Sequence, residues 1–311
     1  MTTIAPSGVP ADTAPRRTRR RLHRGERSLR TTVVLLVVGF NAVLLVYPVV
    51  SALRGSFHRW NPLNGTYDPI GFENYATLFT DPVFWRTALN TVVFGTVVIT
   101  LRVAVGLALA CAIFARVTRW KTFFRTIFYL PTVTPLVAVA YVWKLAYHPQ
   151  IGAVDTVLGL DINWLYDSTF ALPAIMVMTV WKDFGYAVIL FLAGLYAIPE
   201  ETLEASVVDG CSPAQRFRFI TLPLLAPMTV FVVVTSVIAY LQAYVQILVM
   251  TGGGPGRSTN LISFLIYEEA FVKYNFGYAS AIAFVLFFCT ALMTVVSFRL
   301  AGGRSLLKAA R

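Results

Sequence analysis

Charged side chains are scarce in this sequence. Of its 311 residues only 13% are Asp, Glu, Lys or Arg, whereas 57% are hydrophobic, and the mean hydropathy is +0.68. Soluble globular domains average roughly 45 to 50% apolar residues. This shortage of charge excludes an ordinary water-soluble globule and predicts an integral membrane protein.

Residues that usually bind metals or carry catalysis are also few. The three cysteines and three histidines share no spacing typical of a metal or redox site. The run Gly252, Gly253, Gly254 is not followed by the Gly, Lys and Ser or Thr of a phosphate-binding loop. We therefore expect a non-catalytic protein with no cofactor and no metal, which cannot hydrolyse ATP itself.

Long apolar runs are abundant instead. A helix needs roughly 20 apolar residues to cross a hydrocarbon core about 30 Å thick. The sequence predicts an all-α integral membrane protein with six membrane-spanning helices, and this even number places both termini on the same side. The expected spans lie near 31–53, 88–115, 123–147, 171–198, 222–250 and 277–299.

The basic residues indicate which side that is. Of the 26 Lys and Arg residues, 18 lie in the two termini and in the loops after the second and fourth expected spans, whereas residues 148–170 contain three aspartates and no Lys or Arg. Cytoplasmic loops carry an excess of Lys and Arg, so both termini are predicted to be cytoplasmic. The 18 basic residues are Arg16, Arg17, Arg19, Arg20, Arg21, Arg24, Arg27, Arg30, Arg116, Arg119, Lys121, Arg125, Arg216, Arg218, Arg299, Arg304, Lys308 and Arg311.

The basic tail at 1–30 is expected to be disordered and to lie near anionic lipid headgroups. Nucleic acid is a poorer explanation of the net charge of +11, because the basic tail directly precedes an apolar run. Residues 33–53 form an apolar run longer than the roughly 7 to 15 residues of a cleaved signal, so we expect an uncleaved first span. Residues 301–311 are expected to form a second cytoplasmic tail.

Two further segments carry local signals. Residues 54–87 are expected to form an external segment, whose many aromatic residues indicate either an interfacial belt or packing beneath an external partner. Pro131 and Pro135 are expected to bend the third span, because each removes a backbone donor.

Residues 199–221 predict a cytoplasmic loop made of a helix, a turn and a second helix. Pro199 suits the first position of a helix, and Gly210 suits the left-handed residue that ends it. Ser212, Pro213 and Gln215 then predict a capping box that starts the second helix.

The acidic Glu204 and Asp209 have no basic residue at helical spacing within this short first helix. A partner protein could supply the positive charge, or the helix could be a capped surface element without a further role.

The residues Glu204 to Gly210, followed nine residues later by Ile220 to Pro223, resemble the coupling-loop signature of binding-protein-dependent ABC importer permeases. Gly71 to Tyr75, Asn90 with Thr91, and Thr251 to Pro255 are similar to the carbohydrate branch of that family. The sequence departs from the family pattern at Ser206, Cys211, Asp155, Tyr244 and Val245.

This resemblance implies the type I ABC importer permease fold, over about 31–300, in the cell membrane. It implies that the coupling loop docks on a cytoplasmic ATPase, through Glu204, Ala205, Ser206, Asp209, Gly210 and Pro223. It also implies a second homologous permease, two ATPase copies and an extracytoplasmic sugar-binding protein as partners, besides membrane lipids and without nucleic acid.

The overall pattern is most similar to actinobacterial permeases of the trehalose-importer type, so trehalose is the preferred substrate. Other disaccharides, maltodextrins and glycerol phosphates are the alternative substrates. An ion-coupled secondary transporter is the alternative, although it would not need an ATPase-docking loop.

Charges inside spans are costly, so Arg102, Lys182 and Asp183 are expected to have partners. Arg102 and Asp183 fall near the middle of their spans and could pair with each other, contact substrate or line a water-filled cavity. Tyr240 and Tyr244 are expected to share one face of the fifth span, and Tyr and Gln suit sugar hydroxyls, although packing between helices explains them equally well. The complete set of pathway candidates is Asn90, Arg102, Lys182, Asp183, Tyr186, Tyr240, Gln242, Tyr244 and Gln246.

Overall fold

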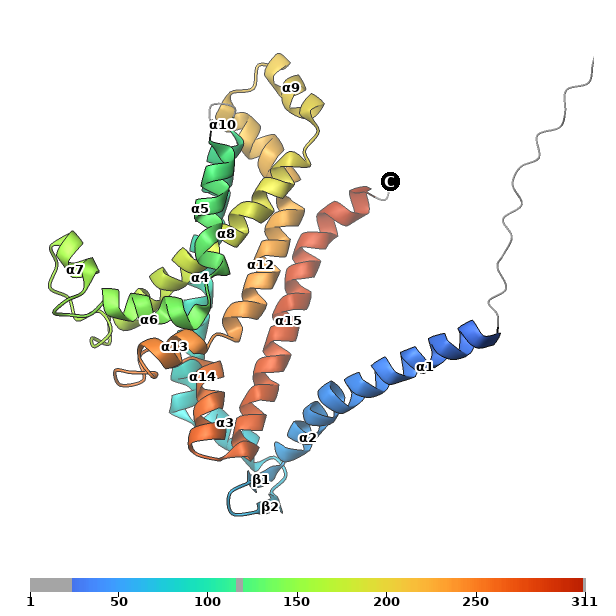
Figure 1. Ribbon diagram of the computed structural model, residues 1–311, viewed down its shortest axis with the longest axis vertical. Helices are drawn as coiled ribbons and strands as arrows, with labels where there is room; N and C mark the ends of the chain where they lie inside the picture. Colours follow the sequence, from blue (N-terminus) through green and yellow to red (C-terminus); the bar gives the residue numbers. More distant parts are fainter. Residues whose placement is uncertain (1–23, 116–119, 310–311) are drawn as a thin grey trace, which may run out of the picture. The chain divides into compact units, whose positions relative to one another are not determined.

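The computed structural model describes residues 24–115 and 120–309, and side chains within 29–115, 120–297 and at 299 (Figure 1). Several expectations for basic residues therefore lie outside the described residues, as does the expectation of disorder for 1–23. The chain divides into two units, residues 1–51 and 52–311, and each is described by itself.

The described part of the first unit, residues 24–51, is helical. It contains α1 (Arg24–Asn41), the π-helical turn η1 (Ala42–Val46) and the beginning of α2 (Tyr47–Gly55). Leu29–Gly55 is long and apolar enough to cross a membrane, as expected for the first span. Since α1 begins at Arg24, the last seven residues of the tail that we expected to be disordered are helical.

The segment between the first two spans is folded. β1 (His58–Asn61) pairs antiparallel with β2 (Thr66–Pro69), and α3 (Glu73–Thr80) follows. The side-chain amide of Asn74 ties α3 to the hairpin, because its Nδ2 donates to the carbonyl oxygens of Ser56 at 2.8 Å and His58 at 3.1 Å. Apart from this two-stranded hairpin, the described secondary structure is helical.

Three further helices could each cross a membrane alone: α4 (Pro82–Phe114), α8 (Ala171–Tyr196) and the Phe276–Ser297 part of α15 (Phe276–Ala309). Two bent pairs complete the six spans if each pair is counted as one. The expected six-span, all-α class is therefore confirmed, with two of the six spans broken.

The third span is broken much more sharply than a kink. α5 (Lys121–Val133) and α6 (Leu136–Ala146) meet at 94°, with extended backbone at Thr134 and Pro135 between them. The bend expected at Pro131 and Pro135 is thus confirmed, although it separates two helices instead of kinking one. α6 packs against α13 (Val245–Met250) and the short α7 (Ala153–Leu158).

The fifth span is also discontinuous. α10 (Pro213–Arg216), η2 (Phe217–Thr221) and α11 (Leu222–Leu224) meet α12 (Ala226–Leu241) at 62°. α12 ends at Leu241, and a new helix, α13, starts at Val245, so a single helix over 222–250 is wrong. The chain continues through α14 (Ile262–Tyr267) and η3 (Glu268–Val272) into α15.

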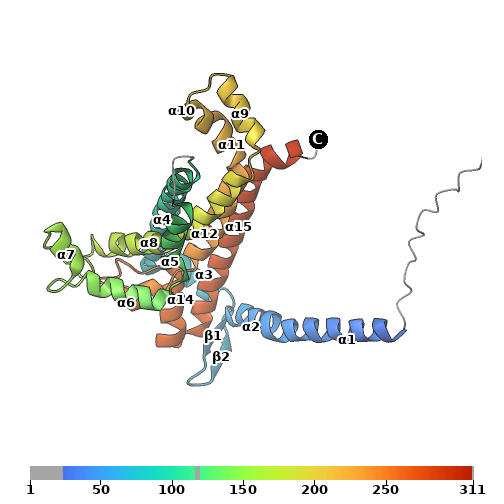
Figure 2. The same cartoon turned by 45° about the horizontal axis from the view of Figure 1, so that its top comes forward.

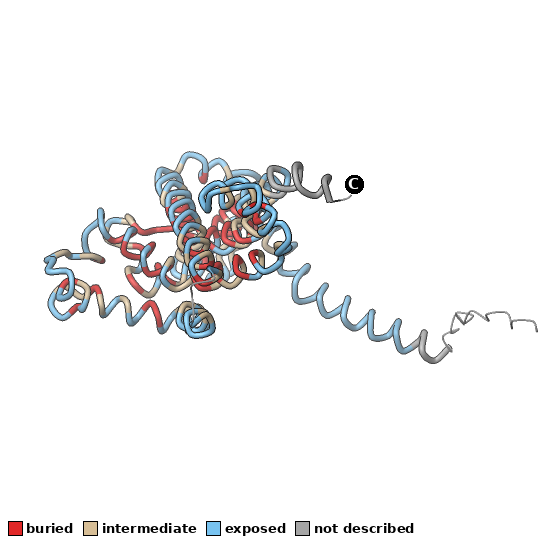
Figure 3. Tube along the Cα trace, turned by 90° about the horizontal axis from the view of Figure 1, so that it is seen from above, coloured by how far each residue is buried: buried red, intermediate tan, exposed pale blue. Residues whose placement is uncertain are grey.

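α8 is the most buried of the three unbroken candidate spans in the second unit. It packs against α4, α5, α12 and α13. Buried positions lie in the interior of the helix bundle, whereas its outer surface is largely exposed (Figure 3). Gly185 permits the close approach of α5, because a Cβ at this position would lie only 1.9 Å from the carbonyl oxygen of Phe128. The polar side chains of α8 are therefore held at fixed positions relative to α4, α5 and α12.

Candidate functional site

The loop between α8 and α12 forms one end of the second unit. It contains α9 (Glu200–Val208), and it lies at the end opposite the β1–β2 hairpin (Figures 1 and 2). Because α15 runs from the hairpin end towards the α9 end, its last described residues lie on the same side as α9. This arrangement agrees with a loop and a C-terminus that share one side of the membrane.

The local expectations for this loop are confirmed with one shift. α9 begins at Glu200, one residue later than expected, with Pro199 as its N-cap. Gly210 follows in the left-handed region with φ = +75°. Ser212 and Gln215 form the capping box: Ser212 Oγ accepts from Gln215 N at 3.3 Å, and Gln215 Oε1 accepts from Ser212 N at 2.8 Å.

Most residues of α9 are exposed, and Glu204, Val207 and Val208 also line a cavity beneath this helix. Val207 and Val208 are 59% and 86% exposed, which is unusual for apolar side chains outside the lipid, and Glu204 is exposed as well. Ser206 is the exception, because it is buried and its hydroxyl donates to the carbonyl oxygen of Leu203 at 2.6 Å. Exposed apolar side chains at a loop tip are typical of a protein contact.

The remaining residues of the predicted docking set are Ala205, Asp209, Gly210 and Pro223, and all four are exposed. Ser206 is buried, so its side chain is not part of the exposed surface of α9. Neither Glu204 nor Asp209 forms an ion pair with another described residue. Their part in ATPase docking stays a prediction.

A cavity of about 1010 Å³ lies beneath α9. The end of α4, the beginning of α5 and the end of α8 line it together with residues of α9, α10 and η2. Most of the lining is apolar, and Lys121, Arg216, Glu200 and Glu204 add charge at its wall. α9 therefore covers a hollow rather than packing tightly on the helices below it.

A second group of predicted residues meets inside the helix bundle. We call Arg102, Lys182, Asp183, Tyr186 and Tyr240 the membrane polar cluster. The Arg102 guanidinium lies 5.5 Å from the ring centroid of Tyr186 and 5.7 Å from that of Tyr240. These distances suit cation–π attraction, which is stronger where water is excluded.

Arg102 and Asp183 do not pair directly, so that expectation is wrong. Asp183 forms its ion pair with the adjacent Lys182, at 3.7 Å between Oδ1 and Nζ, and its Oδ2 accepts from Tyr240 Oη at 3.1 Å. Arg102 Nη1 instead donates to Ser236 Oγ at 2.8 Å. Tyr240 thus stands between the two charges and contacts both.

Arg102 is the most deeply buried charge of this cluster, at 6% exposure, and its Nε has no hydrogen-bond partner. The side chains of Lys182 and Asp183 are 12% and 27% exposed. Two cations and one carboxylate leave the cluster with an excess of hydrogen-bond donors. Such a cluster favours ligands rich in acceptor oxygens.

The other pathway candidates separate from this cluster. The break after Leu241 leaves Gln242 exposed outside the helix, so Tyr240 and Tyr244 do not share a helical face. Tyr240 is buried, whereas Tyr244 is 39% exposed and stacks on Tyr267 with ring centroids 6.0 Å apart. Gln246 is buried in α13.

Asn90 has a structural role that the sequence did not indicate. Its Nδ2 donates to the carbonyl oxygens of Arg257, Ser258 and Asn260 at 3.3, 3.1 and 3.1 Å. Asn90 thereby holds the loop between α13 and α14 against α4, and its amide donor is not free to bind substrate.

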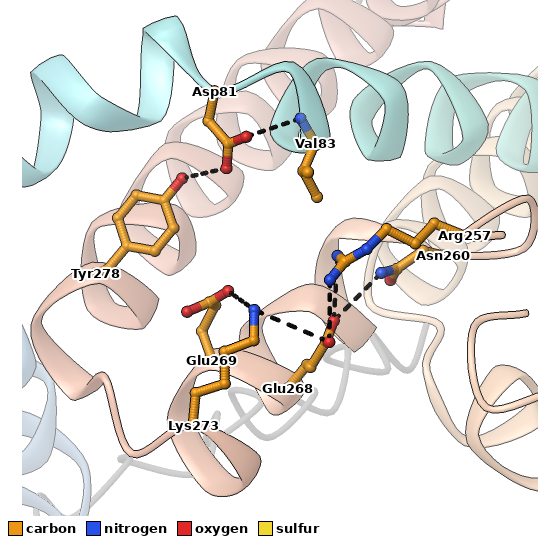
Figure 4. A network of polar contacts seen from close by, with 8 residues as sticks. All are labelled: Asp81, Val83, Arg257, Asn260, Glu268, Glu269, Lys273 and Tyr278. Carbon is orange, nitrogen blue, oxygen red and sulfur yellow. Dashed lines mark hydrogen bonds and ion pairs between the residues drawn. The ribbon is translucent and has the colours of Figure 1, made fainter.

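The sequence analysis missed a charged network near the hairpin end (Figure 4). Glu268 accepts from both Arg257, at 3.3 and 3.4 Å, and Asn260, at 3.4 Å, while Lys273 pairs with Glu268 and Glu269. The sequence signal for this network was the adjacent pair Glu268 and Glu269, which lies between the fifth and sixth expected spans.

A known protein family matches a region of the chain that includes the coupling loop and most of the membrane polar cluster. The family described as "Binding-protein-dependent transport system inner membrane component" matches residues 103–302. The sn-glycerol-3-phosphate transport system permease protein UgpA of Brucella abortus is 34% identical over 277 residues, covering 87% of this chain and 92% of that protein. The trehalose/maltose transport system permease protein MalF of Thermococcus litoralis is 32% identical over 282 residues, covering 87% and 92%.

A solved structure has a similar fold. The crystal structure of a bacterial ABC transporter involved in the import of the acidic polysaccharide alginate contains a chain that superposes with a TM-score of 0.80. The alignment covers 90% of this chain and 97% of the other, at 21% sequence identity. At this identity the likeness concerns the fold alone.

Proposed function

Because the chain belongs to the family of binding-protein-dependent transport system inner membrane components, and is thus a permease of an ABC importer, we propose that it conducts a sugar. Trehalose is the preferred substrate, and α9 is the element that docks on the cytoplasmic ATPase. The exposed, separately capped α9 helix carries this proposal. An ion-coupled transporter would have no use for such a helix.

Coupling follows from how α9 is joined to the membrane helices. Three residues, Ala197 to Pro199, connect it to α8, and α10, η2 and α11 lie between it and α12. A stiff helix held at both ends transmits a rigid-body movement of its partner to α8 and α12. These two helices contribute Asp183 and Tyr240 to the membrane polar cluster, so movement of α9 would change that cluster.

The membrane polar cluster supports a polar, oxygen-rich substrate. Tyr hydroxyls, a carboxylate and two cationic donors can hydrogen-bond sugar hydroxyls, and the Tyr rings offer apolar faces. The trehalose/maltose relative supports a disaccharide. The glycerol-3-phosphate relative supports the alternative of an anionic solute, which the donor excess of the cluster would also accept.

The proposed assembly contains a second homologous permease, two ATPase copies and an extracytoplasmic sugar-binding protein in the cell membrane. The family description itself names dependence on a binding protein. The exposed apolar faces of the span helices suit lipid and a second permease.

The test is uptake of radiolabelled trehalose into vesicles that contain the whole importer, with ATP inside and binding protein outside. Excess unlabelled trehalose should compete and glycerol phosphate should not. We expect Glu204→Lys to lower the initial rate about tenfold, because reversing a charge at a docking surface costs on the order of 1 to 2 kcal/mol.

Asp161→Lys makes the same charge change on an exposed residue outside the coupling loop and should leave uptake near the wild-type rate. Equal uptake by both variants would contradict docking through α9. Competition by glycerol phosphate alone would reassign the substrate.

A further inference from the structure

A polar pocket of about 360 Å³ lies near the hairpin end of the second unit, away from α9. Its lining comes from both halves of the sequence: Arg59, Ile70, Glu73, Asn74, Thr77, Asp81, Glu269, Asn275 and Tyr278. We call it the outer pocket. Its volume is near the lower end of the range for ligand pockets.

The outer pocket is acidic in a strongly basic chain. Three carboxylates and one guanidinium line it, and Lys273 pairs with one of these carboxylates from outside the lining, so one net negative charge remains, whereas the whole chain carries +11. Glu269 is the most buried of the three carboxylates, with a side chain only 10% exposed, and Lys273 compensates it from outside the lining. Glu73 and its partner Arg59 lie at the exposed rim, 3.4 Å apart.

Part of the polar lining has unused hydrogen-bonding capacity. Asn74 is only 8% exposed, and although its Nδ2 is bonded, its Oδ1 accepts no hydrogen bond from another described residue. The side chain of Asn275 likewise forms no hydrogen bond within the described part of the chain. Acceptor oxygens beside carboxylates suit an incoming cationic donor.

The walls of the outer pocket connect the beginnings of two spans (Figure 4). Asp81 caps α4 by accepting from Val83 N at 2.8 Å, and its other oxygen accepts from Tyr278 Oη of α15 at 3.0 Å. A group bound here would contact α3, the start of α4, η3 and α15 together. A molecule that binds in the pocket would therefore contact the beginnings of two membrane helices, α4 and α15, directly.

A divalent metal ion does not fit this arrangement. Within the described residues, no group of three or more His, Cys, Asp or Glu side chains is arranged to hold one. A single positive side chain suits carboxylates that already have separate partners better than a compact ion does.

We propose that the outer pocket receives a lysine or arginine side chain of the extracytoplasmic binding protein. This inference rests on the proposed function, since that function supplies the binding protein and places the pocket on the external side. Complementary charge at such a contact accelerates encounter and makes affinity depend on salt.

The test measures the Kd of fluorescently labelled binding protein for the complete importer in nanodiscs, at low and high salt. We expect the double variant Glu73→Gln/Glu269→Gln to weaken binding at least tenfold and to flatten its salt dependence. The control is Asp161→Asn/Asp167→Asn, which removes two exposed carboxylates elsewhere on the predicted external side and should change Kd less than twofold.

Thr77→Lys is a second variant, which keeps all three carboxylates and adds a positive charge to the lining. It too should weaken binding at least tenfold. Equal affinities of wild type and both pocket variants, or equal losses in pocket and control variants, would overturn the proposal.

A loss of sugar binding would overturn the proposal as well. If the pocket variants bind the binding protein normally but no longer bind free radiolabelled trehalose, the outer pocket is a sugar site. Failure of the wild-type importer to transport with ATP and binding protein would instead refute the proposed function. The two failures are thus distinguishable.

Discussion

Gly210→Val is expected to lower ATP-driven uptake about 30-fold while the protein still reaches the membrane. Gly210 has φ = +75°, and no atom lies within 4 Å of the position that a Cβ would take. Crowding is therefore not the problem. The cost is the left-handed backbone itself, about 2 kcal/mol for a residue with a side chain, which corresponds to a factor of about 30.

The matched control is Gly210→Asn, because asparagine adopts the left-handed region more readily than other residues with a side chain. It should keep most of the wild-type uptake rate. Membrane content is measured for both variants by quantitative immunoblotting. Loss of uptake in both, or in neither, would show that the backbone conformation at the end of α9 does not limit transport.

Asp183→Leu is expected to lower the free energy of unfolding by about 3 kcal/mol, the cost of an uncompensated charge near the centre of a span. Asp183 is the carboxylate that compensates Lys182 and accepts from Tyr240. Its removal leaves Lys182 and Arg102 as two cations with no carboxylate in the membrane polar cluster. Unfolding of the purified importer in detergent, followed by heat or denaturant, gives the measurement.

The double variant Lys182→Met/Asp183→Leu removes the pair together and should recover more than half of that loss. Removing one member of a buried ion pair usually costs far more than removing both. If the single and double variants lose the same free energy of unfolding, the loss does not come from leaving Lys182 without its carboxylate partner.

The local features of the coupling loop were predictable because their causes are local. Ser212 with Gln215, and Gly210 in the left-handed region, depend on neighbours within a few residues. The positions of the spans follow from composition in the same way. Such features need no knowledge of the tertiary fold.

The breaks in the spans were less predictable. Pro131 and Pro135 identify where α5 ends, but the 94° angle depends on where α6 packs, which is against α13. The end of α12 at Leu241 has no proline or glycine to mark it. Tertiary packing, rather than backbone chemistry, decides both geometries.

Polar partners across the fold were the least predictable. The depth of Arg102 and Asp183 in their spans suggested a pair, but Tyr240 from a third helix stands between them. Asn90 bonds carbonyl groups that lie 167 to 170 residues away in the sequence. No spacing rule connects residues so far apart.

Photo-crosslinking from the tip of α9 tests the docking of this helix most directly. A benzophenone amino acid would replace Val208, which is 86% exposed on α9, or Val157, which is 81% exposed on α7, in membranes that contain the complete importer. Docking of α9 predicts an adduct with the ATPase subunit from position 208 and none from position 157. An ATPase adduct from position 157, or none from position 208, would contradict it.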